Sequence, residues 1–141
     1  MKIKYLGTSA AQGIPALFCN CRVCNNARKV KGKEIRSRMQ SLIDDCILID
    51  FGPDSFSHIV SNNLSFEKIS DIFITHSHTD HLVLSEFKWI SQSCSGEKLK
   101  IYACNETYDL IKNMEYPHQA EIIRLHNYVP YILKGYTFTP L

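Results

Sequence analysis

The sequence predicts an α/β fold in which helices pack on a sheet, and three observations support this prediction. Strand-like segments alternate with helix-like segments along the chain, which is typical of layered α/β domains. The composition is 45% hydrophobic and 21% charged, as in an ordinary globular domain. A chain of 141 residues can bury one core, so we expect a single domain over residues 1–141.

The first strands are predicted from apolar runs that end at turn residues. Ile3–Leu6 alternates in polarity and stops at Gly7. Met39–Ile43 and Cys46–Asp50 predict a hairpin, because the aspartate pair between them favours a turn. Residues 8–38 form a long irregular connection. Such a connection is normally functional or anchored, and we expect a metal to anchor this one.

The later elements alternate between helix and strand. Ser55–Asn62 predicts a short helix that ends at an asparagine pair. Leu84–Ser93 is expected to be helical, with Leu84, Phe87 and Ile90 on one face. The other expected elements are strands Ile69–Thr75, Leu99–Ala103 and Ile122–Leu125, helix Glu106–Met114, and a last hairpin of Tyr131–Leu133 and Tyr136–Thr139.

Composition and patterning exclude several classes of protein. No apolar run approaches the roughly 18 residues that a membrane span needs. The N-terminus enters strand-like alternation directly, so we read no signal peptide and expect a cytoplasmic protein. A net charge of +2 gives no indication of nucleic-acid binding. Six cysteines without a secretory signal favour metal binding or reduced thiols over a disulfide framework.

Four metal-capable side chains, His76, His78, Asp80 and His81, follow the predicted strand Ile69–Thr75. Residues two apart in extended chain point to the same side, so His76 and His78 can offer two imidazoles to one ion. Asp80 and His81 fall where the chain turns, and could hold a second ion. Imidazole and carboxylate together suit zinc, manganese or iron. The alternative is a chance cluster of polar loop residues.

The H-x-H-x-D-H pattern resembles the signature of the metallo-β-lactamase superfamily of binuclear metallohydrolases. Three further stretches resemble one branch of it: Tyr5–Pro15, the C-x-C-x-x-C motif Cys19–Cys24, and Ile47–Asp54, which matches "LIDxGPD". That branch contains the phosphoribosyl cyclic phosphodiesterase of phosphonate breakdown and the pyrroloquinoline-quinone biosynthesis protein B. The resemblance covers nearly the whole chain.

The resemblance implies half of an αββα sandwich, with a mixed sheet and helices on one face. The family adds a histidine, a bridging aspartate and a final histidine after a stretch such as Thr137–Leu141, so we expect residues 1–141 to be its N-terminal half. Such a half would be catalytically incompetent by itself. Its sheet would leave one apolar face uncovered, which favours a homodimer, swapping, aggregation or a complementary C-terminal half.

Cys19, Cys21 and Cys24 predict a structural zinc site, because thiolate–zinc bonds stabilise a loop that lacks a core. The alternative is three buried or free thiols. Three thiolates leave a fourth position, which the resembling family fills with a distant downstream histidine. Within the chain, candidates for that position are Cys46, His118 and His126.

The remaining polar residues have weaker signals. Asp50 follows an apolar strand and could cap the next turn. The resemblance implies instead that it braces the metal loop through hydrogen bonds to the metal-binding histidines. Cys46, Cys94 and Cys104 are expected in the core. His58, His118 and His126 are expected to be surface or hydrogen-bonded histidines. The basic residues Arg28, Lys29, Lys31, Lys33, Arg36 and Arg38 form a solvated face or attract a phosphate-bearing substrate.

These residues predict metal-assisted hydrolysis. Two ions, zinc or manganese, would activate a water molecule, and Asp80 would orient that water and carry its proton. The resemblance implies a small phosphodiester substrate, such as a cyclic ribose phosphate or a short nucleotide. Two alternatives remain: a zinc-binding half-domain without activity, and a cofactor-biosynthesis metalloprotein like pyrroloquinoline-quinone protein B.

Overall fold

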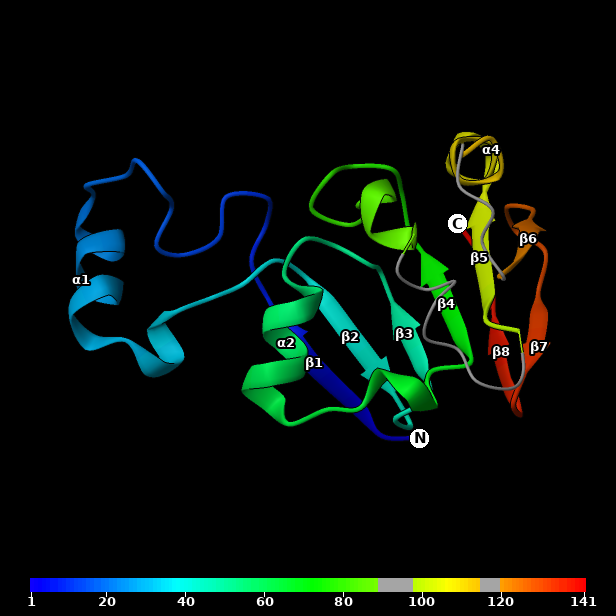
Figure 1. The fold of residues 1–141 in the computed structure, drawn as a ribbon, viewed down its shortest axis with the longest axis horizontal. Helices are drawn as coiled ribbons and strands as arrows, with labels where there is room; N and C mark the ends of the chain where they lie inside the picture. The colour runs from blue at the N-terminus through cyan, green and yellow to red at the C-terminus, as the bar shows by residue number, and fades with distance from the viewer. Residues whose placement is uncertain (89–97, 115–119) are drawn as a thin grey trace.

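The computed structural model describes residues 1–88, 98–114 and 120–141, and Figure 1 shows their arrangement. Within these residues the chain forms a mixed six-stranded sheet, in the order β1-β2-β3-β4-β5-β6, and a two-stranded sheet of β7 and β8. The strands are β1 Ile3–Gly7, β2 Gln40–Ile43, β3 Ile47–Ile49, β4 Asp71–Ile74, β5 Lys100–Cys104, β6 Glu121–Leu125, β7 Tyr131–Leu133 and β8 Tyr136–Phe138. The helices described in full are α1 Arg22–Val30, α2 Ser55–Asn62 and α4 Asn105–Lys112.

The direction of the strands determines where the functional loops lie. β1, β2 and β3 pair antiparallel, whereas β3, β4, β5 and β6 pair parallel. Every residue of β4 is buried, as expected for a strand covered on both faces. Because parallel strands end at the same edge of a sheet, the segments after β3, β4, β5 and β6 lie together at that edge. The predicted metal loop follows β4 there.

Each face of the sheet has its own apolar core. On one face Leu48, Ile72 and Ile101 pack in a cluster that also contains Phe87 and Ile111, which are fully buried. This core supports the predicted packing of helices on the sheet, because Ile111 belongs to α4.

The second face carries the β7–β8 hairpin. Phe73 of β4 stacks between Tyr102 and Phe138, with ring centroids 4.5 Å apart in both pairs. The prediction that this face is uncovered is therefore wrong for the part under the hairpin. At the β1 edge, Ile3 and Tyr5 remain 43% and 65% exposed.

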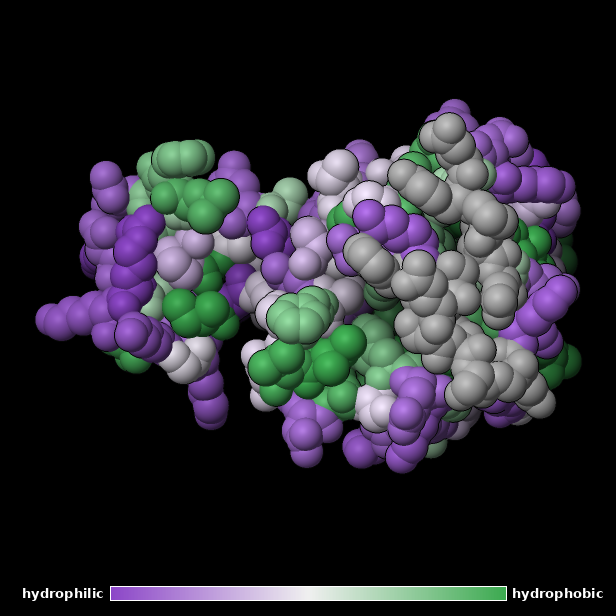
Figure 2. Space-filling model, in the orientation of Figure 1, coloured by the Kyte–Doolittle hydropathy of each residue, from purple (hydrophilic) through white to green (hydrophobic). Residues whose placement is uncertain are grey.

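Residues 8–38 form an arm that projects from the β1 side of the sheet (Figure 1). Its two ends run side by side through isolated bridges between Ser9 and Arg38 and between Ile14 and Arg36. The prediction of an irregular segment missed helix α1, whose N-cap is Cys21. Apolar side chains are exposed on the arm and over α2 (Figure 2), namely Leu17, Phe18, Val23, Phe56 and Val60.

The other predicted elements are found with small shifts of their ends. The helix predicted over Leu84–Ser93 begins as a 3-10 turn at Leu84–Glu86, and most of its remainder lies outside the described residues. The helix predicted at Glu106–Met114 runs from Asn105 to Lys112. Within the described residues, no helix is long and apolar enough to cross a membrane.

Candidate metal centre

The loop from Thr75 to His81 is tied to the segment that follows β3. The backbone N–H of Phe51 donates to the carbonyl of His81 at 2.8 Å, and Val83 N–H donates to the carbonyl of Phe51 at 3.0 Å. Within the loop, His81 N–H donates to the carbonyl of His78 at 2.9 Å. These bonds hold the predicted metal-binding residues against the turn that carries Asp50.

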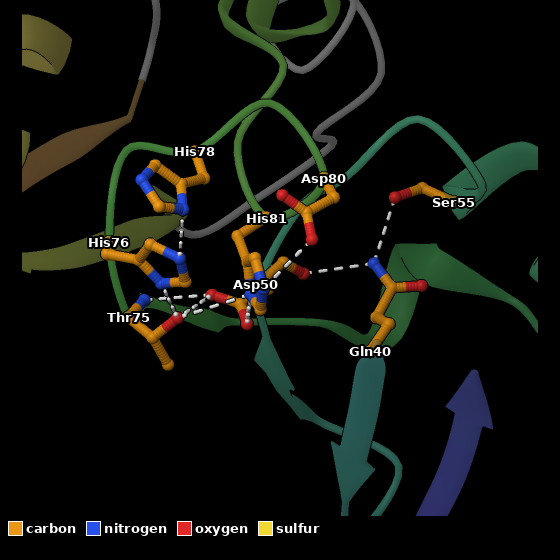
Figure 3. A network of polar contacts seen from close by, with 8 residues as sticks. All are labelled: Gln40, Asp50, Ser55, Thr75, His76, His78, Asp80 and His81. Carbon is orange, nitrogen blue, oxygen red and sulfur yellow. Dashed lines mark hydrogen bonds and ion pairs between the residues drawn. The ribbon is translucent and has the colours of Figure 1, made fainter. Parts of the chain in front are cut away.

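The four predicted ligands come together as two pairs (Figure 3). His76 Nε2 lies 3.1 Å from His78 Nδ1, and His81 Nε2 lies 3.4 Å from Asp80 Oδ2. The rings of His76 and His81 are 4.1 Å apart between centroids, so the two pairs are neighbours. This grouping is the one expected from the sequence, in which alternation pairs His76 with His78 and the turn that follows places Asp80 with His81. Metal binding by the two pairs stays a prediction.

Asp50 lies directly behind this loop. Its carboxylate is 1% exposed, and Oδ2 accepts from His81 Nδ1 at 2.6 Å. Its other oxygen accepts from the backbone N–H and the hydroxyl of Thr75, each at 2.8 Å. The N-cap of the following helix is Asp54, so the capping alternative for Asp50 does not describe its contacts. With Nδ1 donating to Asp50, the free Nε2 of His81 faces Asp80.

Two residues that sequence reasoning missed shape this loop. Thr75 supplies both hydrogen bonds to Asp50 Oδ1. Gly52 lies so close to the loop that a Cβ at this position would stand 2.2 Å from the carbonyl oxygen of Asp80. The glycine of the "LIDxGPD" stretch could have indicated this contact from the sequence, because a glycine at a strand often marks a close approach of another backbone segment.

The donor set fits divalent metal ions. The pKa of His76 is lowered by burial and by the neighbouring charges of His81 and His78, which favours the neutral imidazole that a metal requires. His76 Nδ1 lies 3.0 Å from the Thr75 hydroxyl, so Nε2 is the nitrogen turned toward His78.

The three arm cysteines converge. Ligand atoms of Cys19, Cys21 and Cys24 lie within 4.8 Å of one another, and among the described residues they are the one group in which three such atoms do so. Arg28 holds the loop around them by donating to the carbonyl oxygens of Ala16 and Cys19 at 3.0 and 2.6 Å. The arrangement could bind a metal ion.

The pKa values of Cys21 and Cys24 are shifted in opposite directions. The backbone N–H of Cys24, with the Cys19 and Cys24 side chains, lowers the pKa of Cys21 to about 7. The Ala16 N–H lowers the pKa of Cys24, but burial and the neighbouring thiols outweigh it and raise that pKa overall. A thiol that ionises near neutral pH suits zinc, which binds thiolates.

The candidates for a fourth ligand are not part of this group. Cys46 lies in the turn between β2 and β3, and His126 follows β6, whereas the arm projects beyond β1 (Figure 1). His118 lies outside the described residues. Cys46 and Cys104 pack against the second core as predicted, and Cys94 also lies outside the described residues.

Two further expectations can be compared with the structure. His58 is 3% exposed and both ring nitrogens have hydrogen-bond partners, so it is a buried, satisfied histidine. The basic stretch is divided. Arg28 binds arm carbonyls and Arg38 pairs with Asp54 at 2.8 Å, whereas Lys29, Lys31, Lys33 and Arg36 are exposed.

A cavity of about 670 Å³ opens beside the His76 loop at the carboxyl edge of the sheet. The residues that line it include His76, Ser77, Asn105, Asn127 and Phe138. The cavity is large enough for a small organic ligand.

Comparisons with solved structures identify the fold. A diphosphatase from the PhnP family shares 28% identity, covers 97% of this chain and 55% of its own, and superposes with a TM-score of 0.78. Zn(2+)-bound PqqB from Methylobacterium extorquens is 15% identical, with 92% and 47% coverage and a TM-score of 0.71. YhfI from Bacillus subtilis, a metallo-β-lactamase fold protein, is 16% identical, with 97% and 51% coverage and a TM-score of 0.67. The predicted resemblance and fold class are confirmed.

Two sequence comparisons match a large part of this chain, and the relative found is much longer than the chain. A protein named octanoyltransferase from Porphyromonas gingivalis (strain ATCC BAA-308 / W83) is 28% identical over 116 residues, which are 80% of this chain and 22% of that protein. The chain thus spans about half of the PhnP-family structure and about a fifth of this relative. The family model described as anti-Pycsar protein Apyc1 matches residues 37–121, which include β2 to β5, α4 and the His76 loop and end at the first residue of β6. The chain belongs to the family of the anti-Pycsar protein Apyc1.

Proposed function

We propose that this chain carries the N-terminal ligands of a binuclear centre that hydrolyses phosphodiesters. The observation that supports this most is the pair of ligand pairs at the carboxyl edge of the sheet, with Asp50 buried behind His81. The diphosphatase similarity points to phosphorus–oxygen bonds as the class of bond that is broken. When bound, zinc or manganese would lower the pKa of water and take up charge on the phosphoryl oxygens.

The protein's own residues would hold the metal ions, orient the water molecule and transfer its proton. His76 and His78 present one pair of nitrogens, and His81 presents Nε2 because Nδ1 donates to Asp50. Asp80 lies beside His81 and is the carboxylate that orients water and carries its proton. The cavity beside His76 would accept the organic part of the ester, with Asn105 and Asn127 as hydrogen-bonding groups.

The seven-ligand centre of the resembling family needs more than these four residues. We propose that the further histidines and bridging aspartate come from additional polypeptide, in the same chain or in a partner. We also propose that the arm binds a structural zinc through Cys19, Cys21 and Cys24.

Hydrolysis of bis-p-nitrophenyl phosphate with added manganese or zinc tests the proposal. The samples are residues 1–141, the product of the complete reading frame that contains them, and the Asp80→Ala variant of each. We expect turnover only for the complete product, and its loss in Asp80→Ala. A complete product without turnover above the metal background would contradict hydrolysis and favour the zinc-binding module without activity. Turnover by residues 1–141 that Asp80→Ala abolishes would mean that the site needs no further ligands.

A further inference from the structure

Three buried polar side chains lie between β2 and α2, under the turn that joins β3 to α2. Gln40, Ser55 and His58 are 1%, 6% and 3% exposed. Buried polar groups of this kind destabilise the folded protein unless they are hydrogen-bonded. Each of the three is bonded, and their bonds lead to the metal loop.

The direction of every bond in this group can be assigned. Gln40 Nε2 donates to the Asp50 carbonyl oxygen and to Ser55 Oγ, each at 2.9 Å, and Ser55 Oγ in turn donates to the Gly52 carbonyl at 2.7 Å. A carbonyl can only accept, so the amide of Gln40 has one possible orientation. Its Oε1 must therefore accept from His58 Nδ1, 2.6 Å away.

His58 fixes the other end of Gln40. Burial lowers the pKa of His58, although Asp54 opposes the shift, which favours the neutral ring. Its Nδ1 carries the proton because Gln40 Oε1 accepts from it. Its Nε2 lies 2.7 Å from the Ser37 hydroxyl, which can donate to it. Gln40 is thereby held from both ends, with its amide group directed at Asp50 (Figure 3).

The contact between Gln40 and Asp50 has consequences for the metal loop. Asp50 has a φ of +67°, a left-handed conformation that an aspartate keeps only when its surroundings hold it. Its carbonyl is held by Gln40, and its carboxylate is held 2.6 Å from His81 Nδ1. A rotation of the backbone at Asp50 would therefore redirect its carbonyl and its carboxylate together.

We propose that Gln40 is a positioning residue of the metal centre: by fixing the Asp50 carbonyl, it aims the Asp50 carboxylate at Thr75 and His81. The consequence for metal affinity rests on the proposed function. The consequence for the Thr75 hydrogen bond is a property of this chain without metal.

The test compares Gln40→Glu and Gln40→Leu with two controls. At a pH where its carboxylate is ionised, Gln40→Glu still accepts from His58 but has no hydrogen to donate to Asp50, so it separates the two ends of Gln40. The first control is Ser41→Ala. Ser41 is the neighbouring buried residue in β2, and its hydroxyl has no hydrogen-bond partner within the described residues. Ile111→Ala removes core volume on α4 and matches a general loss of stability.

Two measurements are made on each variant. The first is amide hydrogen exchange at Thr75 in metal-free protein, followed by NMR. The second is affinity for Mn²⁺ by electron paramagnetic resonance, because manganese prefers nitrogen and oxygen ligands and avoids the arm thiols. We expect both Gln40 variants to exchange Thr75 about tenfold faster and to bind Mn²⁺ about tenfold more weakly, as for other outer partners of metal ligands. Ser41→Ala should leave both values unchanged, and Ile111→Ala should change Thr75 exchange only as far as its general loss of stability does.

The outcomes separate the two proposals. Thr75 exchange in Gln40→Glu that matches Ser41→Ala, or in both Gln40 variants that matches Ile111→Ala, would overturn the positioning role. A wild-type chain that does not bind Mn²⁺ would contradict the proposed metal centre, while Thr75 exchange would still decide the role of Gln40. Should Gln40→Leu fail to fold, Gln40→Glu alone gives the answer.

Discussion

The cysteine arm and the His76 loop hold their candidate ligands in different ways. In the arm, three thiols from one short segment converge within 4.8 Å, and Arg28 donates to carbonyl oxygens of the same arm. In the His76 loop, the ligands form two pairs, and a buried carboxylate from another strand connection holds one of them. We therefore expect the arm to depend on metal for its order, whereas hydrogen bonds to the segment after β3 hold the loop.

This difference predicts which site organises which part of the molecule. A loop without a core gains its folding energy from the metal itself. A loop braced by buried hydrogen bonds keeps its shape without metal, and loses affinity when the bracing is removed. The substitutions below separate these two modes.

The largest effect is expected from His76→Ala combined with His78→Ala, which removes one complete ligand pair. Elemental analysis should show that metal at the loop is lost while the metal of the arm remains. Ser77→Ala, between the two histidines, is the matched control and should keep both. A metal content that the double substitution leaves unchanged would contradict a centre at this loop.

Cys21→Ser should abolish binding at the arm and leave the loop intact. Serine is a preferred N-cap, so the start of α1 keeps its cap while the thiolate is lost. We expect loss of the arm zinc and faster proteolysis within residues 8–38, with unchanged Mn²⁺ affinity at the His76 loop. Proteolysis at the wild-type rate would show that the arm holds its structure without metal.

Asp50→Asn should weaken metal binding at the loop by about 10- to 100-fold. If the asparagine oxygen keeps its bonds to Thr75, its amide donates to His81 Nδ1, which moves the imidazole proton to Nε2, the nitrogen beside Asp80. A protonated Nε2 cannot bind metal. Titration with Mn²⁺ measures the effect, and Asp45→Asn, at the exposed β2–β3 turn, is the control. Equal affinities of the two variants would exclude a bracing role for Asp50.

Gly52→Ala tests the packing of the turn against the loop. The new Cβ would lie 2.2 Å from the Asp80 carbonyl oxygen, so the loop or the turn must shift. We expect a loss of about 1–3 kcal/mol in the free energy of unfolding, measured by urea denaturation. Pro53→Ala, the exposed neighbour, should change it much less. A stability equal to wild type would show that the two segments separate at little cost.

The sequence predicted the sheet and the ligand pairs better than it predicted the contacts that hold them. The His76 loop was accessible because period-two alternation places His76 and His78 on one side of an extended chain. Asp50 was accessible through its motif. Gln40 and His58 were not, because a buried amide and a buried histidine carry no local pattern, and their partners lie 10 to 21 positions away. Helix α1 was missed because its apolar residues are few and its cap is a cysteine.

The smallest expected effect concerns His58 and pH. Burial lowers the pKa of His58 below its ordinary value, with Asp54 opposing the shift. Between the two pKa values the unfolded chain binds more protons than the folded chain, so stability rises with pH in that interval. The contribution of His58 is therefore fully present above about pH 6.5 and is lost as pH falls through the lowered pKa.

The urea midpoint of metal-free protein, measured from pH 8 to pH 5, tests this expectation. His58→Gln keeps a donor for Gln40 Oε1 but cannot titrate. The wild type should lose stability on acidification faster than this variant, by at most about 1.4 kcal/mol per pH unit for one titrating group. His126→Gln, at an exposed position, is the control and should follow the wild-type curve. Parallel curves for wild type and His58→Gln would mean that His58 protonates without disturbing its bond to Gln40. Protonation would then leave Gln40, and through it the Asp50 turn, unchanged across this pH range, so the brace of the His76 loop would not respond to acid.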